Sequence, residues 1–250
     1  MATSSSQEHL SLPVSIIVGS IIIGGSIIFA VANTSGRPNQ AANPAPAAVA
    51  PVQQGNQQQN NARTADIKSV KASGAQVVGL PAAPITVAYW FDYQCPVCKS
   101  AEANVMSKII TEYVKTGKIR VVFKDLQFLG PDSASLGLAA RAVGEVAPAK
   151  FYDWHKAVFE NQGQENSGWA TKEKILSITT SVLGKASADK VMLLMVSKAA
   201  TYQKSLDADK AEGETFGINA TPSFIIGNKL MVGLSSYENI KTTIEASIKK

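Results

Sequence analysis

Apolar residues follow strand and helix periods in turn from residue 85 onward. A run of β-branched and aromatic side chains predicts a strand at residues 85–91. An apolar repeat of about four residues predicts a helix at residues 96–115, with Pro96 at the first helical position, where proline is favoured. A second strand is predicted at residues 119–124. The resulting strand–helix–strand unit should be parallel and right-handed, which indicates an α/β fold.

Helical patterns dominate the stretch after this second strand. Polar residues suited to helix starts stand at Asp132, Thr171 and Ser187. The periods predict four helices, near residues 132–147, 149–162, 171–183 and 187–212. Together they are expected to form an all-helical insertion at about residues 131–213.

The C-terminal part returns to strand patterns. Short strands are predicted at residues 223–226 and 229–232, on either side of the hairpin signal Gly227-Asn228. The run Ser235-Ser236-Tyr237-Glu238 is a capping box, which predicts the start of the last helix. The chain thus returns from the helical insertion to the α/β fold.

Residues 12–32 carry no charged side chain and are rich in Ile, Val and Gly. Their length is about what a helix needs to cross a bilayer. The rival interpretation is a cleaved signal peptide, because Ala30-Val31-Ala32 has the small-x-small form that a signal peptidase accepts. The run is long and no Lys or Arg precedes it, which favours an uncleaved transmembrane anchor after a short segment of residues 1–11.

Residues 33–65 differ in composition from the rest of the chain. They are mainly Asn, Gln, Pro and Ala, and up to Thr64 they include two arginines and no acidic residue. Such a composition cannot bury enough apolar surface to fold. This segment is expected to be a disordered linker, and residues 66–250 are expected to form one globular domain.

The formal net charge of +5 is modest, and the lysines are scattered over the predicted helices. A solvated surface explains this pattern better than a track for nucleic acid. No nucleic-acid partner is therefore expected.

Cys95 and Cys98 are the two cysteines of the chain, and their spacing closes too small a loop for a bridge to stabilise the fold by chain entropy. Reactivity is the better explanation. The predicted strand delivers Cys95 to the first turn of a helix, where unpaired backbone N–H groups and the helix dipole favour a thiolate. Cys98 lies one turn deeper on the same face, so it can attack a mixed disulfide formed at Cys95.

The two sulfurs are therefore expected to have different roles. Cys95 is predicted to be the exposed nucleophile with a low pKa, and Cys98 the buried resolving thiol. The dipeptide Pro96-Val97 between them is expected to tune the relative stability of dithiol and disulfide. Because no His stands there, we expect a reduction potential less oxidising than that of the strongest oxidants of this kind.

Two structural interpretations compete with redox chemistry. A zinc site needs four ligands, and only His9 and His155 remain as nitrogen donors, with His9 on the far side of the predicted membrane segment. A static disulfide stays open as an alternative, although a CxxC motif between a strand and a helix is typical of redox sites. No metal and no cofactor are expected.

Two blocks of this sequence resemble the DsbA-like branch of the thioredoxin superfamily. The first precedes and includes the cysteines, and the second follows the helical stretch. They read Val87-Ala88-Tyr89-Trp90-Phe91-Asp92-Tyr93-Gln94-Cys95-Pro96-Val97-Cys98 and Gly217-Ile218-Asn219-Ala220-Thr221-Pro222-Ser223-Phe224-Ile225-Ile226-Gly227-Asn228. The likeness covers roughly residues 76–248 and implies a thioredoxin-like fold with an all-helical insertion.

The resemblance also implies roles for Thr221 and Pro222. The bond between them would be cis and would lie opposite the cysteines. The backbone of Thr221 would then pair with an extended substrate chain next to Cys95, as a short added strand. The alternative for Pro222 is an ordinary proline at the start of a strand.

Three other polar residues near the motif carry weaker signals. Asp92 and Glu102 could each relay a proton to Cys98, or each could be a solvated carboxylate at the end of an element, and neither is counted as catalytic. His155 stands among Phe151, Trp154 and other apolar residues of a predicted amphipathic helix, which favours a packing role.

The expected function is that of a thiol:disulfide oxidoreductase that donates its Cys95–Cys98 disulfide to cysteine pairs of secreted or surface proteins. A membrane partner would reoxidise it, and the domain would be anchored outside the cytoplasm, where thiols are not held reduced. One alternative is a reductase or isomerase of the same fold. Another is a non-catalytic, membrane-tethered peptide-binding module.

Overall fold

The structure is a computed structural model that describes residues 63–249. Residues 1–11, the predicted membrane segment at 12–32 and most of the predicted linker lie outside this range. Among residues 63–249, no helix combines the length and the apolar character that a membrane span requires.

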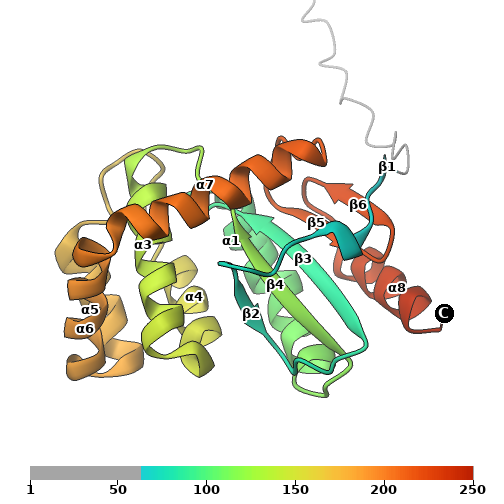
Figure 1. The fold of residues 1–250 in the computed structure, drawn as a ribbon, viewed down its shortest axis with the longest axis horizontal. Coiled ribbons are helices and arrows are strands. Elements are labelled where there is room, and N and C mark those ends of the chain that lie inside the picture. Colours follow the sequence, from blue (N-terminus) through green and yellow to red (C-terminus); the bar gives the residue numbers. More distant parts are fainter. Residues whose placement is uncertain (1–62, 250) are drawn as a thin grey trace, which may run out of the picture. The chain divides into compact units, whose positions relative to one another are not determined.

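A six-stranded sheet forms the centre of the domain, with strand order β1-β6-β5-β3-β4-β2 (Figure 1). Strands β3 and β4 pair in parallel, and the other neighbours pair antiparallel. The strands are β1 Arg63–Thr64, β2 Gln76–Val78, β3 Ile85–Phe91, β4 Ile119–Asp125, β5 Ser223–Ile226 and β6 Lys229–Val232. The bounds predicted for β3, β5 and β6 are confirmed, and β4 extends one residue beyond the predicted strand.

The two outer strands, β1 and β2, were not predicted. Residues Arg63–Thr64 pair with β6, although their composition placed them in the linker, and the following Ala65 N–H continues the contact to the Asn228 carbonyl. The ordered domain therefore begins before residue 66. Strands this short contain too few residues to show an alternating pattern.

One helical stretch follows β3 and matches the helix predicted at residues 96–115. It consists of α1 Pro96–Ala101, a π-helical turn at Glu102–Met106, α2 Ser107–Ile109 and a second π-helical turn at Ile110–Val114. Short 3₁₀ helices lie at Ile67–Ser69 and Pro148–Lys150. The remaining helices are α3 Pro131–Val146, α4 Phe151–Glu160, α5 Lys172–Leu183, α6 Lys185–Ser197, α7 Ala199–Thr215 and α8 Tyr237–Ile248.

The helical insertion contains five α-helices instead of the four predicted. The helix predicted at residues 187–212 is broken at Lys198, where φ and ψ are −114° and 16°, and α6 and α7 lie on either side. Apolar residues continue across this break, so the periodicity gave no sign of it. The helices α4, α5 and α6 pack in sequence, and α6 also packs against α3.

Helix starts were predicted with mixed success. Thr171 is the N-cap of α5 and its side chain accepts a hydrogen bond from the Lys174 N–H, as predicted. The predicted starts at Asp132 and Ser187 are wrong, because glycines with positive φ precede both helices and α3 and α6 begin earlier. The last helix has Ser236 as its N-cap, one residue after the first residue of the predicted capping box.

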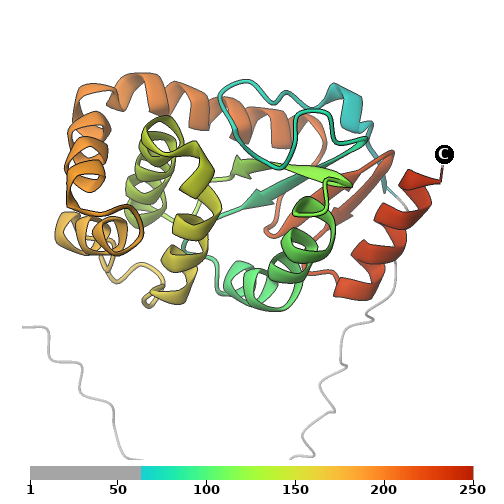
Figure 2. The ribbon, with the colours of Figure 1, turned by 90° about the horizontal axis from the view of Figure 1, so that it is seen from below.

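Alternate residues of β3 supply two cores on opposite faces of the sheet. Val87, Tyr89 and Phe91 belong to the larger core, and Ala88 and Trp90 belong to the smaller one. Figure 2 shows α1 and α8 beside one face and α7 along the other. The sheet is therefore covered on both faces, as expected for a strand–helix–strand unit with buried parallel strands.

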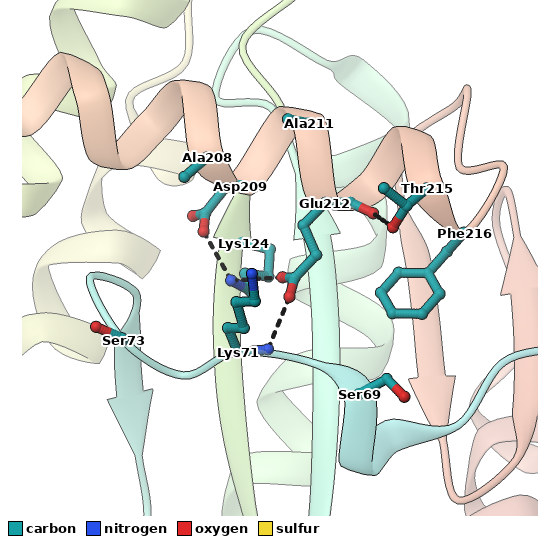
Figure 3. A pocket seen from close by; sticks show the side chains of 10 residues that line it. All are labelled: Ser69, Lys71, Ser73, Lys124, Ala208, Asp209, Ala211, Glu212, Thr215 and Phe216. Atoms are coloured by element: carbon teal, nitrogen blue, oxygen red, sulfur yellow. Dashed lines mark hydrogen bonds and ion pairs between the residues drawn. The ribbon is translucent and has the colours of Figure 1, made fainter.

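A buried ion cluster fastens α7 to the sheet (Figure 3). The Asp209 carboxylate lies 2.8 Å from the Lys124 Nζ of β4 and 2.5 Å from a guanidinium nitrogen of Arg141 on α3. Glu212 Oε2 lies 2.8 Å from the same lysine. The Trp90 indole N–H donates to the Asp209 carbonyl at 3.1 Å. The helix that this cluster fastens ends at Thr215, six residues before Thr221.

Candidate active site at the Cys95 turn

Cys95 lies where β3 has ended and α1 begins. It is the N-cap residue of α1, with an extended backbone (φ −69°, ψ 116°), and Pro96 follows in the first helical turn. The Cys98 N–H donates to Cys95 Sγ at 3.3 Å. The reactive sulfur therefore occupies the place of a capping oxygen, where it receives one of the unpaired N–H groups of a helix start.

Both cysteines are free thiols and both are buried. Cys98 has no exposed surface, as predicted, but Cys95 is only 6% exposed, so the expectation of an exposed nucleophile is wrong. The cover comes partly from a distant loop, because Cys95 Sγ lies 3.6 Å from the carbonyl oxygen of Thr221. Val97, between the cysteines, is 43% exposed and marks the accessible side of the turn.

The surroundings move the pKa values of the two thiols in opposite directions. The Cys98 thiol, which hydrogen-bonds to Cys95, is the largest of the influences that together lower the pKa of Cys95 to about 6 despite partial burial. Thr221 and the backbone N–H groups of Val97 and Cys98 contribute to the same lowering. Burial is the main cause that raises the pKa of Cys98 well above its usual range, followed by its neighbour Cys95. At neutral pH, Cys95 therefore carries the thiolate and Cys98 keeps its proton.

The structure brings Thr221 and Pro222 to the cysteines across a long sequence separation. Their peptide bond is cis, as the resemblance implied. Both residues are buried, and the Thr221 carbonyl faces Cys95 Sγ. The two sequence blocks therefore form one site.

Asp92 is a buried carboxylate, which corrects the alternative that it is a solvated group and leaves the proton relay as a prediction. Its side chain has no exposed surface. One oxygen accepts from the Gln94 N–H and the Ser133 hydroxyl, and the other accepts from the N–H groups of Phe128 and Leu129. With four donors, this carboxylate joins the Cys95 turn to the loop between β4 and α3.

Glu102, which directly follows α1, and His155 of α4 form a second buried group. Glu102 is only 2% exposed, so it is not a solvated carboxylate. Its Oε2 lies 3.3 Å from His155 Nε2, and His155 Nδ1 lies 3.0 Å from the Tyr93 hydroxyl. His155 also packs against aromatic rings, with the Phe91 centroid at 4.7 Å. The packing role predicted for His155 is confirmed, and its polar contacts were not predicted.

Gln94 and Gln162 are site residues that sequence reasoning missed. The Gln94 side chain donates to the Leu129 carbonyl and accepts from the Asn166 N–H. The Gln162 amide nitrogen donates to the carbonyls of Tyr93 and Cys95. Nothing in the local sequence distinguishes these glutamines from solvated ones, because their partners come from other elements.

The described part of the chain offers no group of three or more His, Cys, Asp and Glu side chains arranged to hold a metal ion. A thiolate at Cys95 and a protonated thiol at Cys98 form the pair that thiol–disulfide exchange requires.

Comparisons with known proteins agree with this chemistry. A family model described as thioredoxin matches residues 71–246. Disulfide bond formation protein D of Bacillus subtilis is 27% identical over 198 residues, which cover 77% of this chain and 84% of that protein.

Solved structures show the same fold. The crystal structure of oxidised BdbD from Bacillus subtilis is 26% identical, with a TM-score of 0.67 over 76% of this chain and 100% of that one. The α-DsbA2 protein of Wolbachia pipientis, at 22% identity and a TM-score of 0.60, covers 69% of this chain and 86% of its own, and supports the fold alone. The chain therefore belongs to the thioredoxin family, as a protein-disulfide oxidoreductase of its DsbA-like branch.

Proposed function

We propose that this oxidoreductase is a disulfide donor, in which Cys95 is the nucleophile and Cys98 the resolving thiol. The observation that carries the proposal is the opposite shift of the two thiol pKa values, with that of Cys95 lowered to about 6 and that of Cys98 raised. A stabilised Cys95 thiolate favours the dithiol form, because only the reduced form contains this thiolate, and it also makes Cys95 a good leaving group. The disulfide form is then easily reduced, which is the property of a donor.

The exchange proceeds in two steps. A substrate thiolate attacks Cys95 Sγ, the Cys95–Cys98 bond breaks, and the Cys98 sulfur leaves with the electron pair and takes up a proton. A second substrate thiolate then attacks the substrate sulfur that is bound to Cys95, and Cys95 leaves as a thiolate. The substrate loses two electrons to form its disulfide, and the enzyme gains them as a dithiol.

Thr221 and Pro222 are proposed to hold the substrate chain during this exchange. Their loop lies against Cys95, with the Thr221 carbonyl 3.6 Å from the sulfur. An extended peptide beside this loop would present its cysteine to Cys95 and could pair with the backbone of Thr221. The exposed Val97 side chain offers an apolar contact on the same turn.

The substrates proposed are cysteine-containing proteins outside the cytoplasm, where thiols are not held reduced. The proposal includes residues 12–32 as a single-pass membrane anchor and a membrane partner that removes two electrons from the dithiol. A flexible linker of about 30 residues spans an r.m.s. distance of roughly 30 Å, which would let one domain reach both partner and substrate. The support for this part is the composition of the N-terminal sequence.

Stoichiometric transfer to a model substrate tests the direction of the reaction. The full chain in its disulfide form is mixed with a reduced peptide that contains two cysteines, and both products are weighed by mass spectrometry. We expect the peptide to lose two hydrogen atoms and the chain to gain two, with the transient mixed disulfide on Cys95. A peptide that stays reduced, while the dithiol form of the chain instead reduces a peptide disulfide, would mark a reductase.

A further inference from the structure

Just after the end of α4, the side chain of Gln162 hydrogen-bonds to the Cys95 turn. Its amide nitrogen donates to the Tyr93 carbonyl at 2.8 Å and to the Cys95 carbonyl at 3.1 Å. Both partners belong to the turn that connects β3 to α1, whereas Gln162 comes from the helical insertion, 67 residues after Cys95. One carboxamide group therefore bridges two carbonyls on either side of Gln94.

A second contact joins the same two segments. The Lys99 Nζ of α1 lies 3.4 Å from the Gln162 carbonyl, so the backbone of Gln162 accepts from the helix whose start its side chain holds. The Cys95 carbonyl also accepts from the Lys99 N–H at 3.2 Å, which is the first backbone bond of this helix. The end of α4 is thus tied to the first turn of α1 from both directions.

We propose that Gln162 is a positioning residue for thiol–disulfide exchange, through which the helical insertion holds the Cys95 turn in its reactive conformation. The inference rests on the role proposed for Cys95. The turn matters because the extended backbone of Cys95 is what lets its sulfur accept the Cys98 N–H at 3.3 Å. If the Cys95 carbonyl rotates, that bond is lost and the thiolate loses a donor.

The charge distribution of the carboxamide acts in the same direction. Its two N–H groups point their positive ends at the carbonyls of Tyr93 and Cys95, in the turn that carries the thiolate. The ionisable groups that face this turn from α1 are the Cys98 thiol and the exposed Lys99, and the loop at Thr221 contributes a carbonyl. A carboxylate at position 162 would replace the two donors by a negative charge at the same place.

Four variants of the full chain separate this role from a general effect of charge or stability. Gln162→Ala removes the donors, and Gln162→Glu removes them and adds a charge. Gln164→Ala and Gln164→Glu are the matched controls, because Gln164 is an exposed glutamine two positions along whose side chain makes none of the hydrogen bonds found among residues 63–249. The readouts are the pH profile of Cys95 alkylation, located by mass spectrometry, and the equilibrium with glutathione.

Loss of the two donors should move both readouts. Because the Cys98 N–H contact to Cys95 Sγ depends on the conformation of this turn, we expect Gln162→Ala to raise the Cys95 pKa by about half a unit to one unit. Ionisation of Cys95 at pH 7 favours the dithiol form over the disulfide form. If the Cys95 pKa rises by one unit from about 6, this preference falls about fivefold, which makes the reduction potential about 20 mV less oxidising. Gln162→Glu should shift both readouts further, and the Gln164 variants should shift neither.

Three outcomes would overturn the inference. One is a Gln162→Ala protein with lower thermal stability but an unchanged pH profile and glutathione equilibrium, which would make Gln162 a structural anchor only. Another is an equal shift in Gln162→Glu and Gln164→Glu, which would assign the effect to charge at a distance. If Gln162→Glu does not fold, Gln162→Met removes the donors at similar size, and an unchanged profile there overturns the inference equally.

Failure of the proposed function has a different signature. In that case the pH profile of Cys95 alkylation in the wild-type chain would show no pKa near 6, and the wild-type chain would not reach an equilibrium with glutathione. A wild-type chain that exchanges normally, beside Gln162 variants that do the same, would reject only the role of Gln162.

Discussion

Replacing Cys95 with serine is expected to abolish disulfide exchange and leave the fold intact. A hydroxyl cannot form the mixed disulfide, so transfer to a reduced two-cysteine peptide should fall to the rate measured without protein. Serine is among the best N-cap residues, so the start of α1 should survive the change. Peptide oxidation, followed beside circular dichroism and thermal unfolding, measures both parts of this expectation.

The matched variant is Cys98→Ser. It keeps the nucleophile and removes the resolving thiol, so we expect a stable mixed disulfide between Cys95 and the peptide, detectable by mass. Cys98→Ala, which removes this donor without putting a hydroxyl in its place, should raise the Cys95 pKa, because the Cys98 thiol is the largest influence that lowers it. A Cys95→Ser protein that still exchanges would contradict the role of Cys95, and one that no longer exchanges but still performs its role in the cell would favour the non-catalytic peptide-binding module.

Replacing Asp209 with alanine is expected to destabilise the domain more than any change at its surface. The carboxylate contacts both Lys124 and Arg141, whose side chains are 2% and 4% exposed. Breaking a buried ion pair by removing one partner typically costs about 3–5 kcal/mol, because the remaining charge stays buried without compensation. For a domain of this size, that corresponds to a fall in Tm on the order of 10 °C.

Asp207→Ala provides the control for this measurement. Asp207 lies on the same helix, is exposed, and accepts a hydrogen bond from the Gln203 side chain. Its removal should change the free energy of unfolding by no more than about 0.5 kcal/mol. Equal effects of the two substitutions in urea unfolding would show that Glu212 alone compensates Lys124, and that the ion cluster does not fasten α7.

The central strands and the cysteine pair were predictable because their signals are local. Strand β3 is an unbroken run of β-branched and aromatic residues, and β5 and β6 flank a Gly-Asn hairpin turn. The outer strands β1 and β2 were missed because two or three residues carry no period. The break between α6 and α7 was missed because the apolar residues run through it.

The surroundings of the site were less predictable, because they depend on contacts between distant parts of the chain. Cys95 was expected to be exposed, but Thr221, 126 residues later, lies against its sulfur. Asp92 and Glu102 looked like ordinary carboxylates until the structure placed them among buried donors from other elements. Gln162 stands two positions from another glutamine, Gln164, and only the folded turn shows which of the two reaches the Cys95 carbonyl.

The reduction potential of the Cys95–Cys98 pair tests the proposal of a disulfide donor most directly. The full chain would be equilibrated with glutathione buffers of known ratio, and the oxidised fraction read by alkylation of the free thiols. We expect a potential near or above about −150 mV, well above the −270 mV or so of thioredoxin. A value near that of thioredoxin would favour a reductase, and a disulfide that resists reduction below about −300 mV would mean a static bridge and contradict the catalytic role of both cysteines.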